Sequence, residues 1–344
     1  MKTFILTASY GGWHNAAAEA IQDKFQEKWE EASIIDFVEE IGKMGSKSKN
    51  FHENVVAEKL KFLWRIAFKT SNYRPIRNFI QKVLKKKFNN KLQKIVKNSK
   101  PDLIIITNPL WLPFLDEESK VKTAIVVTDA MNIHSFWYKD FIDHYFLIDK
   151  FSKKRFIERF WHNPDQVHDT FFPMKEKFFI DKKTIENKRI YILLDSQKYK
   201  FILNLVSLLD SKKFCKEIVI IKHRNQEVFD KLKENTRSKK IFFQDFVNLK
   251  ENFWNIDIFI WKPGGAVVTE CIATSTPIVV TTFIPGQEQG NIELMEKLWI
   301  WFYSKKPKEI VDRIENKNWN TTIPAFEDTK NSKVLEDIYK ILRK

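Results

Sequence analysis

The residues best suited to chemistry lie at 260–273, where an apolar strand is followed by a glycine pair and a helix. This block reads Ile-Trp-Lys-Pro-Gly-Gly-Ala-Val-Val-Thr-Glu-Cys-Ile-Ala. Gly264 and Gly265 have no Cβ, so backbone N–H groups there can come close to a ligand. The N-terminus of the following helix carries a partial positive charge that suits a phosphate. Glu270, near the first turns of this helix, can accept two ribose hydroxyls. The alternative is a tight turn with a solvated Glu270.

A second polar block, Ile-Pro-Gly-Gln-Glu-Gln-Gly-Asn at 284–291, follows a predicted strand and begins another helix. Gln287 and Asn291 are four residues apart, so we expect them on one helical face, with Glu288 beside them. Amide and carboxylate side chains offer both donors and acceptors, as sugar hydroxyls require. This block predicts a sugar-binding position. Ordinary polarity at a helix start is the alternative interpretation.

Two series of short apolar strands alternate with helices and would position these blocks. We expect strands at 3–8, 33–37, 103–107, 124–128 and 144–148, and then at 189–194, 217–221, 240–243, 256–260 and 277–281. Helices are expected from about residue 15, within 51–97 and at 333–343. Continuous apolar strands between helices indicate parallel sheets covered on both faces. The fold class is therefore α/β, with Rossmann-like domains at 1–172 and 173–329, a cleft between them, and residues 330–344 packing back toward the first.

The positive charge of the chain is concentrated in one segment. The net charge is +15, from 59 Lys and Arg against 44 Asp and Glu. Residues 59–100 hold fourteen of the basic residues and no acidic one, so the remainder is nearly neutral, with 45 basic against 44 acidic residues. Apolar residues recur there at helical spacing, beside a Lys-rich face, which suits the surface of an anionic membrane. The residues that we expect at that surface are Trp64, Arg65, Phe68, Lys82, Lys85, Lys86 and Lys87.

The basic segment has two alternative interpretations. Its apolar face could join the domain core, with lysines that are merely solvated. Nucleic acid is the other anionic partner, but no zinc finger or RNA-recognition motif is present, and the charge accompanies an apolar stripe instead of polar base-reading residues. We therefore expect no nucleic-acid partner.

Composition narrows the remaining possibilities. No apolar run approaches the roughly 18–20 residues that span a bilayer, and the opening segment is too short for the apolar core of a secretory signal. The two cysteines, Cys215 and Cys271, are far apart and form no CxxC motif. The histidines show no metal-ligand spacing, so neither a disulfide framework nor a metal site is expected, and a reducing cytoplasm fits.

The chain resembles the diacylglycerol glycosyltransferases, a family that includes plant monogalactosyldiacylglycerol synthase and bacterial processive diacylglycerol glucosyltransferase. Four regions carry the likeness: 8–17 (Ala-Ser-Tyr-Gly-Gly-Trp-His-Asn-Ala-Ala), Thr128-Asp129 with His134 and Trp137, 262–273, and 284–291. The resemblance implies glycosyltransferase family 28 and the GT-B fold, in which two Rossmann-like domains face each other across a cleft.

The resemblance also implies roles for residues. Gly264, Gly265 and Thr269 would hold the diphosphate of a UDP-sugar donor, Glu270 its ribose, and Gln287, Glu288 and Asn291 its hexose. The loop with Gly11 and Gly12 would carry His14 to the reacting centre. Such enzymes invert the anomeric carbon in one displacement, and either His14 or Asp129 would be the base. His134 is more simply a packed residue that supports its loop. No cofactor or metal is implied, because helix dipoles, backbone N–H groups and basic side chains can stabilise the leaving group.

Two positions depart from the family pattern. Trp13 stands where the family loop usually has another glycine. Asp195 begins the segment after the first strand of the second domain, where a glycine-rich turn is usual, and a diphosphate would meet its carboxylate, partly offset by Lys198 and Lys200.

The leading hypothesis is a peripheral enzyme at the cytoplasmic face of the cell membrane that transfers a hexose to diacylglycerol or a glycosylated diacylglycerol. Alternatives are a polyprenyl-linked or lipopolysaccharide-type acceptor, or an inactive relative that binds membrane or nucleotide. The sequence indicates neither the hexose nor the oligomeric state.

Overall fold

The computed structural model describes residues 1–10, 12–51, 61–115, 117–174, 188–195, 197–223, 225–245, 255–286, 288–298, 301–316 and 333–344. Its contacts divide the chain into two compact units. The first unit comprises residues 1–176, 284–291 and 331–344, and the second comprises 177–283 and 292–330. The block at 284–291, which the sequence places within the second domain, is therefore grouped with the first unit.

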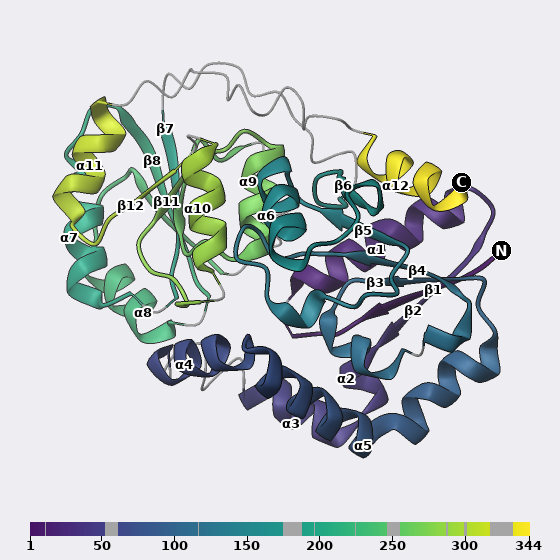
Figure 1. The fold of residues 1–344 in the computed structure, drawn as a ribbon. Helices are drawn as coiled ribbons and strands as arrows, with labels where there is room; N and C mark the ends of the chain where they lie inside the picture. The colour runs from purple at the N-terminus through teal and green to yellow at the C-terminus, as the bar shows by residue number, and fades with distance from the viewer. Residues whose placement is uncertain are drawn as a thin grey trace. The chain divides into compact units, whose positions relative to one another are not determined.

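The first unit is built on a parallel six-stranded sheet of order β2-β1-β3-β4-β5-β6 (Figure 1). Its strands are β1 (Lys2–Thr7), β2 (Glu31–Asp36), β3 (Leu103–Ile106), β4 (Lys122–Val126), β5 (His144–Leu147) and β6 (Val167–Asp169). The α-helices are α1 (Gly12–Glu27), α2 (Phe37–Glu40), α3 (Lys43–Phe51), α4 (Lys61–Ser71), α5 (Arg74–Ser99), α6 (Lys150–Phe160) and α12 (Val334–Arg343). Short 3-10 turns include η2 (Pro109–Phe114) and η4 (Ser135–Trp137).

Helices cover both faces of this sheet because its strands are apolar on both sides. Ala17, Ala18 and Ile21 of α1 are buried, and small side chains allow a helix to pack closely on a sheet. The residues of α5 that pack against the core of the other face are Leu84, Phe88 and Ile95. Figure 1 shows α1 and α12 on one side of the strands and α5 on the other.

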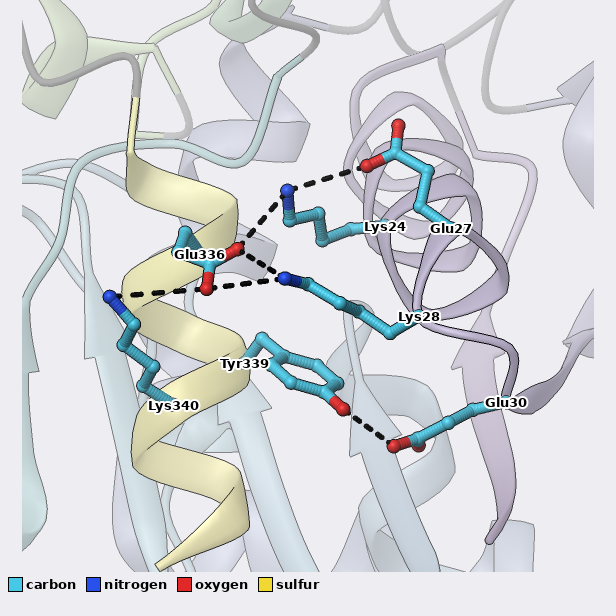
Figure 2. A network of polar contacts seen from close by, with 7 residues as sticks. All are labelled: Lys24, Glu27, Lys28, Glu30, Glu336, Tyr339 and Lys340. Carbon is cyan, nitrogen blue, oxygen red and sulfur yellow. Dashed lines mark hydrogen bonds and ion pairs between the residues drawn. The ribbon is translucent and has the colours of Figure 1, made fainter.

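The C-terminal helix α12 packs against α1, as Figure 2 shows. The carboxylate of Glu336 lies 3.2 Å from the ammonium of Lys24 and 3.1 Å from that of Lys28. The hydroxyl of Tyr339 donates to Glu30 over 2.7 Å, and its ring lies edge-on to Phe25. The last helix of the chain is thereby held in the first unit.

The second unit contains another parallel six-stranded sheet, of order β12-β11-β10-β7-β8-β9. Its strands are β7 (Lys188–Leu193), β8 (Cys215–Ile221), β9 (Ile241–Gln244), β10 (Ile258–Trp261), β11 (Ile278–Val280) and β12 (Trp301–Tyr303). The helices are α7 (Tyr199–Asp210), α8 (Gln226–Asn235), α9 (Gly265–Ala273), α11 (Pro307–Asn316) and α10 (Gln289–Lys297), which begins in the segment grouped with the first unit. In Figure 1, α7, α8 and α11 lie on one side of the strands and α9 and α10 on the other.

Candidate functional site

His14 lies at the carboxyl edge of the first sheet, at the point where the strand order reverses. From β1 the chain runs first to β2 on one side and then to β3 on the other, and ligands of open α/β sheets bind at such a reversal. The Nδ1 atom of His14 is 2.7 Å from the carbonyl oxygen of Thr107, which follows β3. It is also 3.0 Å from the hydroxyl of Thr128, which follows β4.

These contacts determine the form of the imidazole. A carbonyl oxygen only accepts, so Nδ1 of His14 carries the proton and donates to Thr107. Burial lowers the pKa of His14 to about 4, although the bond to Thr107 opposes the shift. The ring is therefore neutral at pH 7. Its Nε2 atom holds a lone pair and makes no hydrogen bond to the described residues.

The loop that carries His14 is held by side chains. Thr7 donates to the side chain of Asn15 over 2.9 Å, and Asn15 donates to the hydroxyl of Ser9 over 2.7 Å. Ser9 donates in turn to Asp36, whose other oxygen caps α2 at Val38. Gly12 is the exposed first residue of α1, and Gly11 lies outside the described residues.

Trp13, which replaces a glycine of the family pattern, braces the same loop. Its indole N–H donates to the carbonyl oxygen of Thr128 over 2.8 Å. Its ring contacts Phe172, with 4.1 Å between the ring centroids. The larger side chain therefore ties α1 to the segment after β4.

Asp129 is bonded within its own loop. Its Oδ2 accepts from the indole N–H of the buried Trp137 over 2.8 Å. Burial raises the pKa of Asp129 to about 6, against the bonds from Trp137 and from the backbone N–H of His134. The ring of Trp137 also lies 6.1 Å from that of His14, between centroids. Both predicted base candidates thus border the same tryptophan.

His134 links this loop to α4. Its Nδ1 accepts from the backbone N–H of Phe136 over 3.2 Å, and its Nε2 lies 3.3 Å from the carbonyl oxygen of Phe68 and 3.1 Å from the hydroxyl of Ser71. The residue is buried, and burial lowers its pKa to about 4. Both ring nitrogens are thus used in packing the loop against α4.

The segment at 284–291 packs against the loop that follows Asp129. The side-chain amide of Asn132 donates to the carbonyl oxygen of Gly286 over 3.1 Å. Gly286 has a φ of +91°, and a Cβ there would lie 3.0 Å from the Phe68 ring. A Cβ on Gly290 would overlap the carbonyl oxygen of Ala130. Glycine is therefore needed at both positions.

Of the sugar-binding residues predicted in this segment, Asn291 lies within α10 and Glu288 lies just before it. Because α10 begins at Gln289, Glu288 precedes the helix instead of lying on its face, and Gln287 lies outside the described residues. Glu288 is buried, and its Oε2 accepts from the backbone N–H of Ile284 over 2.6 Å. Asn291 is also buried.

In the second unit, the glycine pair begins α9 as the sequence predicts. Gly264 is the N-cap, without a side-chain cap, and Gly265 is the first helical residue. Thr269 and Glu270 are the fifth and sixth residues of α9 and are both buried. The hydroxyl of Thr269 donates to the carbonyl oxygen of Ala266 over 3.2 Å, so it bonds within its own helix.

Asp195, the second departure from the family pattern, is buried after β7. Its carboxylate is 3.2 Å from the ammonium of Lys262 and 3.8 Å from Nδ1 of His223. Lys198 and Lys200, which were expected to offset this charge, are exposed. The sequence did not single out Lys262 or His223 as partners, although Lys262 immediately precedes Pro263 and the glycine pair.

Comparison with known proteins finds the same likeness in sequence. A family model described as monogalactosyldiacylglycerol (MGDG) synthase matches residues 14–174. A processive diacylglycerol β-glucosyltransferase of Bacillus pumilus is 24% identical over 342 residues, which cover 92% of this chain and 86% of the relative. A probable chloroplastic monogalactosyldiacylglycerol synthase 2 of Oryza sativa subsp. indica is 24% identical over 347 residues, which cover 92% of this chain and 73% of the relative. This chain is therefore similar in sequence to diacylglycerol glycosyltransferases over most of its length.

Solved structures confirm the fold that the resemblance implies. Acinetobacter baumannii MurG matches 100% of this chain and 99% of its own with a TM-score of 0.61 and 12% identity. Anabaena HepE, solved in complex with UDP, matches 100% of both chains with a TM-score of 0.55 and 12% identity. Together with the two parallel sheets, these matches show the GT-B fold of glycosyltransferases.

The interval matched by the monogalactosyldiacylglycerol synthase model includes the basic segment. Among the described side chains of α4, α5 and the turn between them, seven large apolar ones are exposed: Phe62, Leu63, Ile66, Tyr73, Ile76, Phe79 and Val83. They lie among the exposed basic residues Arg65, Lys82, Lys86 and Lys87. We call these eleven residues the α4–α5 surface.

Three residues predicted for this surface lie deeper. Trp64, Phe68 and Lys85 are half-buried, and Phe68 packs edge-on against His134. The apolar residues of α4 therefore lie on two faces of the helix. One face packs against the first unit and the other faces solvent.

Three further features belong to the described part of the chain. No helix in it is long and apolar enough to cross a membrane. Within it, no group of three or more His, Cys, Asp or Glu side chains could hold a metal ion. Cys215 and Cys271 are both buried, and no disulfide joins them.

Proposed function

We propose that this protein transfers a hexose from a UDP-sugar to diacylglycerol, or to a glycosylated diacylglycerol, with inversion at the anomeric carbon. The names of the relatives support the glycolipid product, since the likeness to both extends over 92% of the chain. UDP as the nucleotide is supported by the UDP complex of a protein with the same fold. The observation that carries the proposal is the neutral His14 at the strand reversal, within the interval that the family model matches.

His14 is proposed as the general base. Its Nδ1–H is fixed on Thr107, so Nε2 is the atom that takes the proton of the acceptor hydroxyl. The acceptor oxygen bonds to the anomeric carbon as the bond from that carbon to the UDP oxygen breaks, and UDP leaves with the electron pair. The negative charge that develops on UDP stabilises the imidazolium formed on His14.

Asp129 is the second candidate base. A pKa of about 6 is closer to working pH than that of His14, which favours Asp129 as a proton acceptor. Its carboxylate, however, already accepts from Trp137 and from the backbone of His134. We therefore assign Asp129 to positioning Trp137 beside His14.

The donor is assigned to the glycine turn and the helix after it. Backbone N–H groups at Gly264 and Gly265 would hold the diphosphate at the N-terminus of α9, where the helix dipole favours an anion. Glu270 would hold the ribose, and Gln287, Glu288 and Asn291 would hold the hexose. Thr269 contributes through helix packing, given its bond to Ala266. The mechanism uses no metal, because these groups can stabilise the leaving diphosphate.

The acceptor is a lipid, and the α4–α5 surface is the proposed membrane contact. Exposed apolar side chains among lysines suit an anionic bilayer, at which each basic residue contributes about 1 kcal/mol. We place the protein at the cytoplasmic face of the cell membrane as a peripheral enzyme. There, UDP-sugars and the lipid acceptor are both accessible.

The test is a screen of purified protein with radiolabelled UDP-glucose, UDP-galactose and UDP-N-acetylhexosamines, each offered with a mixed lipid extract. We expect label in a lipid that co-migrates with a glycosyl-diacylglycerol. Label in a polyprenyl-linked or lipopolysaccharide-type lipid would change the acceptor. No labelled lipid with any donor would contradict the proposal. Calorimetry with UDP then tests the donor site, since Glu270→Ala should abolish binding.

A further inference from the structure

Asp195 and Lys262 meet at the reversal of strand order in the second sheet. From β7 the chain proceeds to β8 and β9 on one side, and β10, β11 and β12 follow on the other. The reversal therefore lies between β7 and β10, and the crevice at the carboxyl ends of these two strands is the expected ligand position. Asp195 follows β7 by two residues, and Lys262 directly follows β10.

The ion pair between these residues is well shielded from water. Lys262 Nζ is 3.2 Å from Asp195 Oδ2, and the two side chains are 13% and 6% exposed. The backbone N–H of Asp195 donates to Gln197 Oε1 over 2.7 Å, and Gln197 Nε2 lies 3.3 Å from the hydroxyl of Thr281, which follows β11. Asp195 is thus linked, directly or through Gln197, to the ends of β10 and β11.

Asp195 remains ionised at any working pH. Burial alone would raise its pKa, but the bonds and charges of His223 and Lys262 outweigh burial and hold the pKa well below the ordinary range. A fixed negative charge therefore lies at the strand reversal. Lys262 belongs to the turn that begins α9, because the backbone N–H of Gly264 donates to its carbonyl oxygen over 2.9 Å.

Resting on the proposed function, we propose that Asp195 is a specificity-determining residue of the donor site, which weakens diphosphate binding by holding Lys262 in an internal ion pair. A diphosphate at the N-terminus of α9 is repelled by the carboxylate and competes with it for the same ammonium group. The affinity of the site then depends less on the phosphates and more on the nucleoside and the hexose.

Calorimetric titrations of UDP, UMP and uridine test this, with the wild-type protein and the isosteric Asp195→Asn. We expect Asp195→Asn to bind UDP about tenfold more tightly, because the ammonium group of Lys262 is then released to pair with the diphosphate. The gain for UMP should be smaller, and uridine should change less than about twofold. Asp230→Asn removes the same charge from the exposed face of α8 in the same unit. It should leave all three affinities unchanged.

A double-mutant cycle separates the ion pair from a general effect of charge. Lys262→Met should weaken UDP binding, and in Asp195→Asn/Lys262→Met the gain from Asp195→Asn should be largely lost. The proposal would be overturned if Asp195→Asn increased UDP affinity fully in the absence of Lys262. It would also be overturned if Asp195→Asn were folded, as judged by circular dichroism, and bound UDP no more tightly than the wild-type protein.

The titrations also distinguish this proposal from the function on which it rests. Wild-type binding that is lost in Glu270→Ala supports the donor site whatever Asp195→Asn does. UDP binding by Asp195→Asn alone would support the role of Asp195. If neither protein binds UDP, GDP, ADP or dTDP, both proposals fail.

Discussion

The Nδ1 atom of His14 lies 2.7 Å from the carbonyl oxygen of Thr107, a residue 93 positions further along the chain. This one contact fixes the tautomer of the ring, because the carbonyl oxygen can only accept. It also fixes the ring at the carboxyl edge of the first sheet, where the strand order reverses. The proposed chemistry follows from this position and from the lone pair on Nε2.

Replacing His14 should remove the proposed base and leave the fold intact. We expect His14→Ala to lower kcat by about 10²–10⁴, the usual contribution of general base catalysis, with a smaller effect on the KM of the donor. Initial rates with the donor that the screen selects give both parameters. His168→Asn is the matched control. Burial also lowers the pKa of His168 to about 4, but this residue lies in the edge strand β6 and not at the strand reversal. Comparable losses in the two variants would contradict a catalytic role for His14.

The pH dependence of kcat/KM distinguishes the two candidate bases. A base must be deprotonated in the free enzyme, so the rate falls as pH decreases through its pKa. Because the pKa of His14 is lowered to about 4, we expect a nearly constant kcat/KM between pH 5.5 and about 8. With Asp129 as the base, kcat/KM would fall about tenfold per pH unit below about 6. A profile that bends near 6 would transfer the role to Asp129.

Substitution of two glycines, one as the test and one as the control, probes how the segment at 284–291 packs. A Cβ on Gly290 would overlap the carbonyl oxygen of Ala130, whereas a Cβ on Gly12 would meet no atom within 4 Å. We expect Gly290→Ala to destabilise the protein by about 1–3 kcal/mol, and Gly12→Ala to change stability by less than about 0.5 kcal/mol. Thermal unfolding followed by circular dichroism measures both. Equal melting temperatures would show that the segment does not pack as described.

Membrane binding should depend on the lysines of α5. The triple variant Lys82→Gln, Lys86→Gln and Lys87→Gln should bind anionic liposomes on the order of 100-fold more weakly, at about 1 kcal/mol per charge. Co-sedimentation at low and high salt measures this, and the difference should shrink at high salt. The control removes three exposed lysines of the second unit, Lys231, Lys233 and Lys239. If both triple variants bind alike, net charge and not the α4–α5 surface is responsible.

The sequence predicts most of the fold, because apolar strands between helices leave a local pattern. The ten expected strands are present within about two residues at either end. The two that were missed, β6 (Val167–Asp169) and β12 (Trp301–Tyr303), are three residues long and lie at sheet edges. The equally short β11 was expected because its three residues are all buried and form an apolar run, whereas β6 at the sheet edge is partly exposed and leaves no such run.

The candidate site is less accessible to sequence reasoning because long-range contacts define it. The bond from Asn132 to Gly286 joins residues 154 positions apart and groups the 284–291 segment with the first unit. Asp195 and Lys262 are 67 positions apart in the chain, and nothing in the sequence around either residue indicates that they form an ion pair. In α4, apolar residues occur on both faces, so spacing alone did not show that Phe68 packs inward while Phe62 and Ile66 face solvent.

The most direct test of inverting transfer to diacylglycerol is the anomeric configuration of the product. The purified protein would be incubated with the selected α-linked UDP-hexose and anionic liposomes that contain diacylglycerol, and the glycolipid analysed by proton NMR. We expect a β-linked hexosyl-diacylglycerol from the wild-type protein and almost none from His14→Ala. An α-linked product, or no glycolipid from the wild-type protein, would contradict the claim.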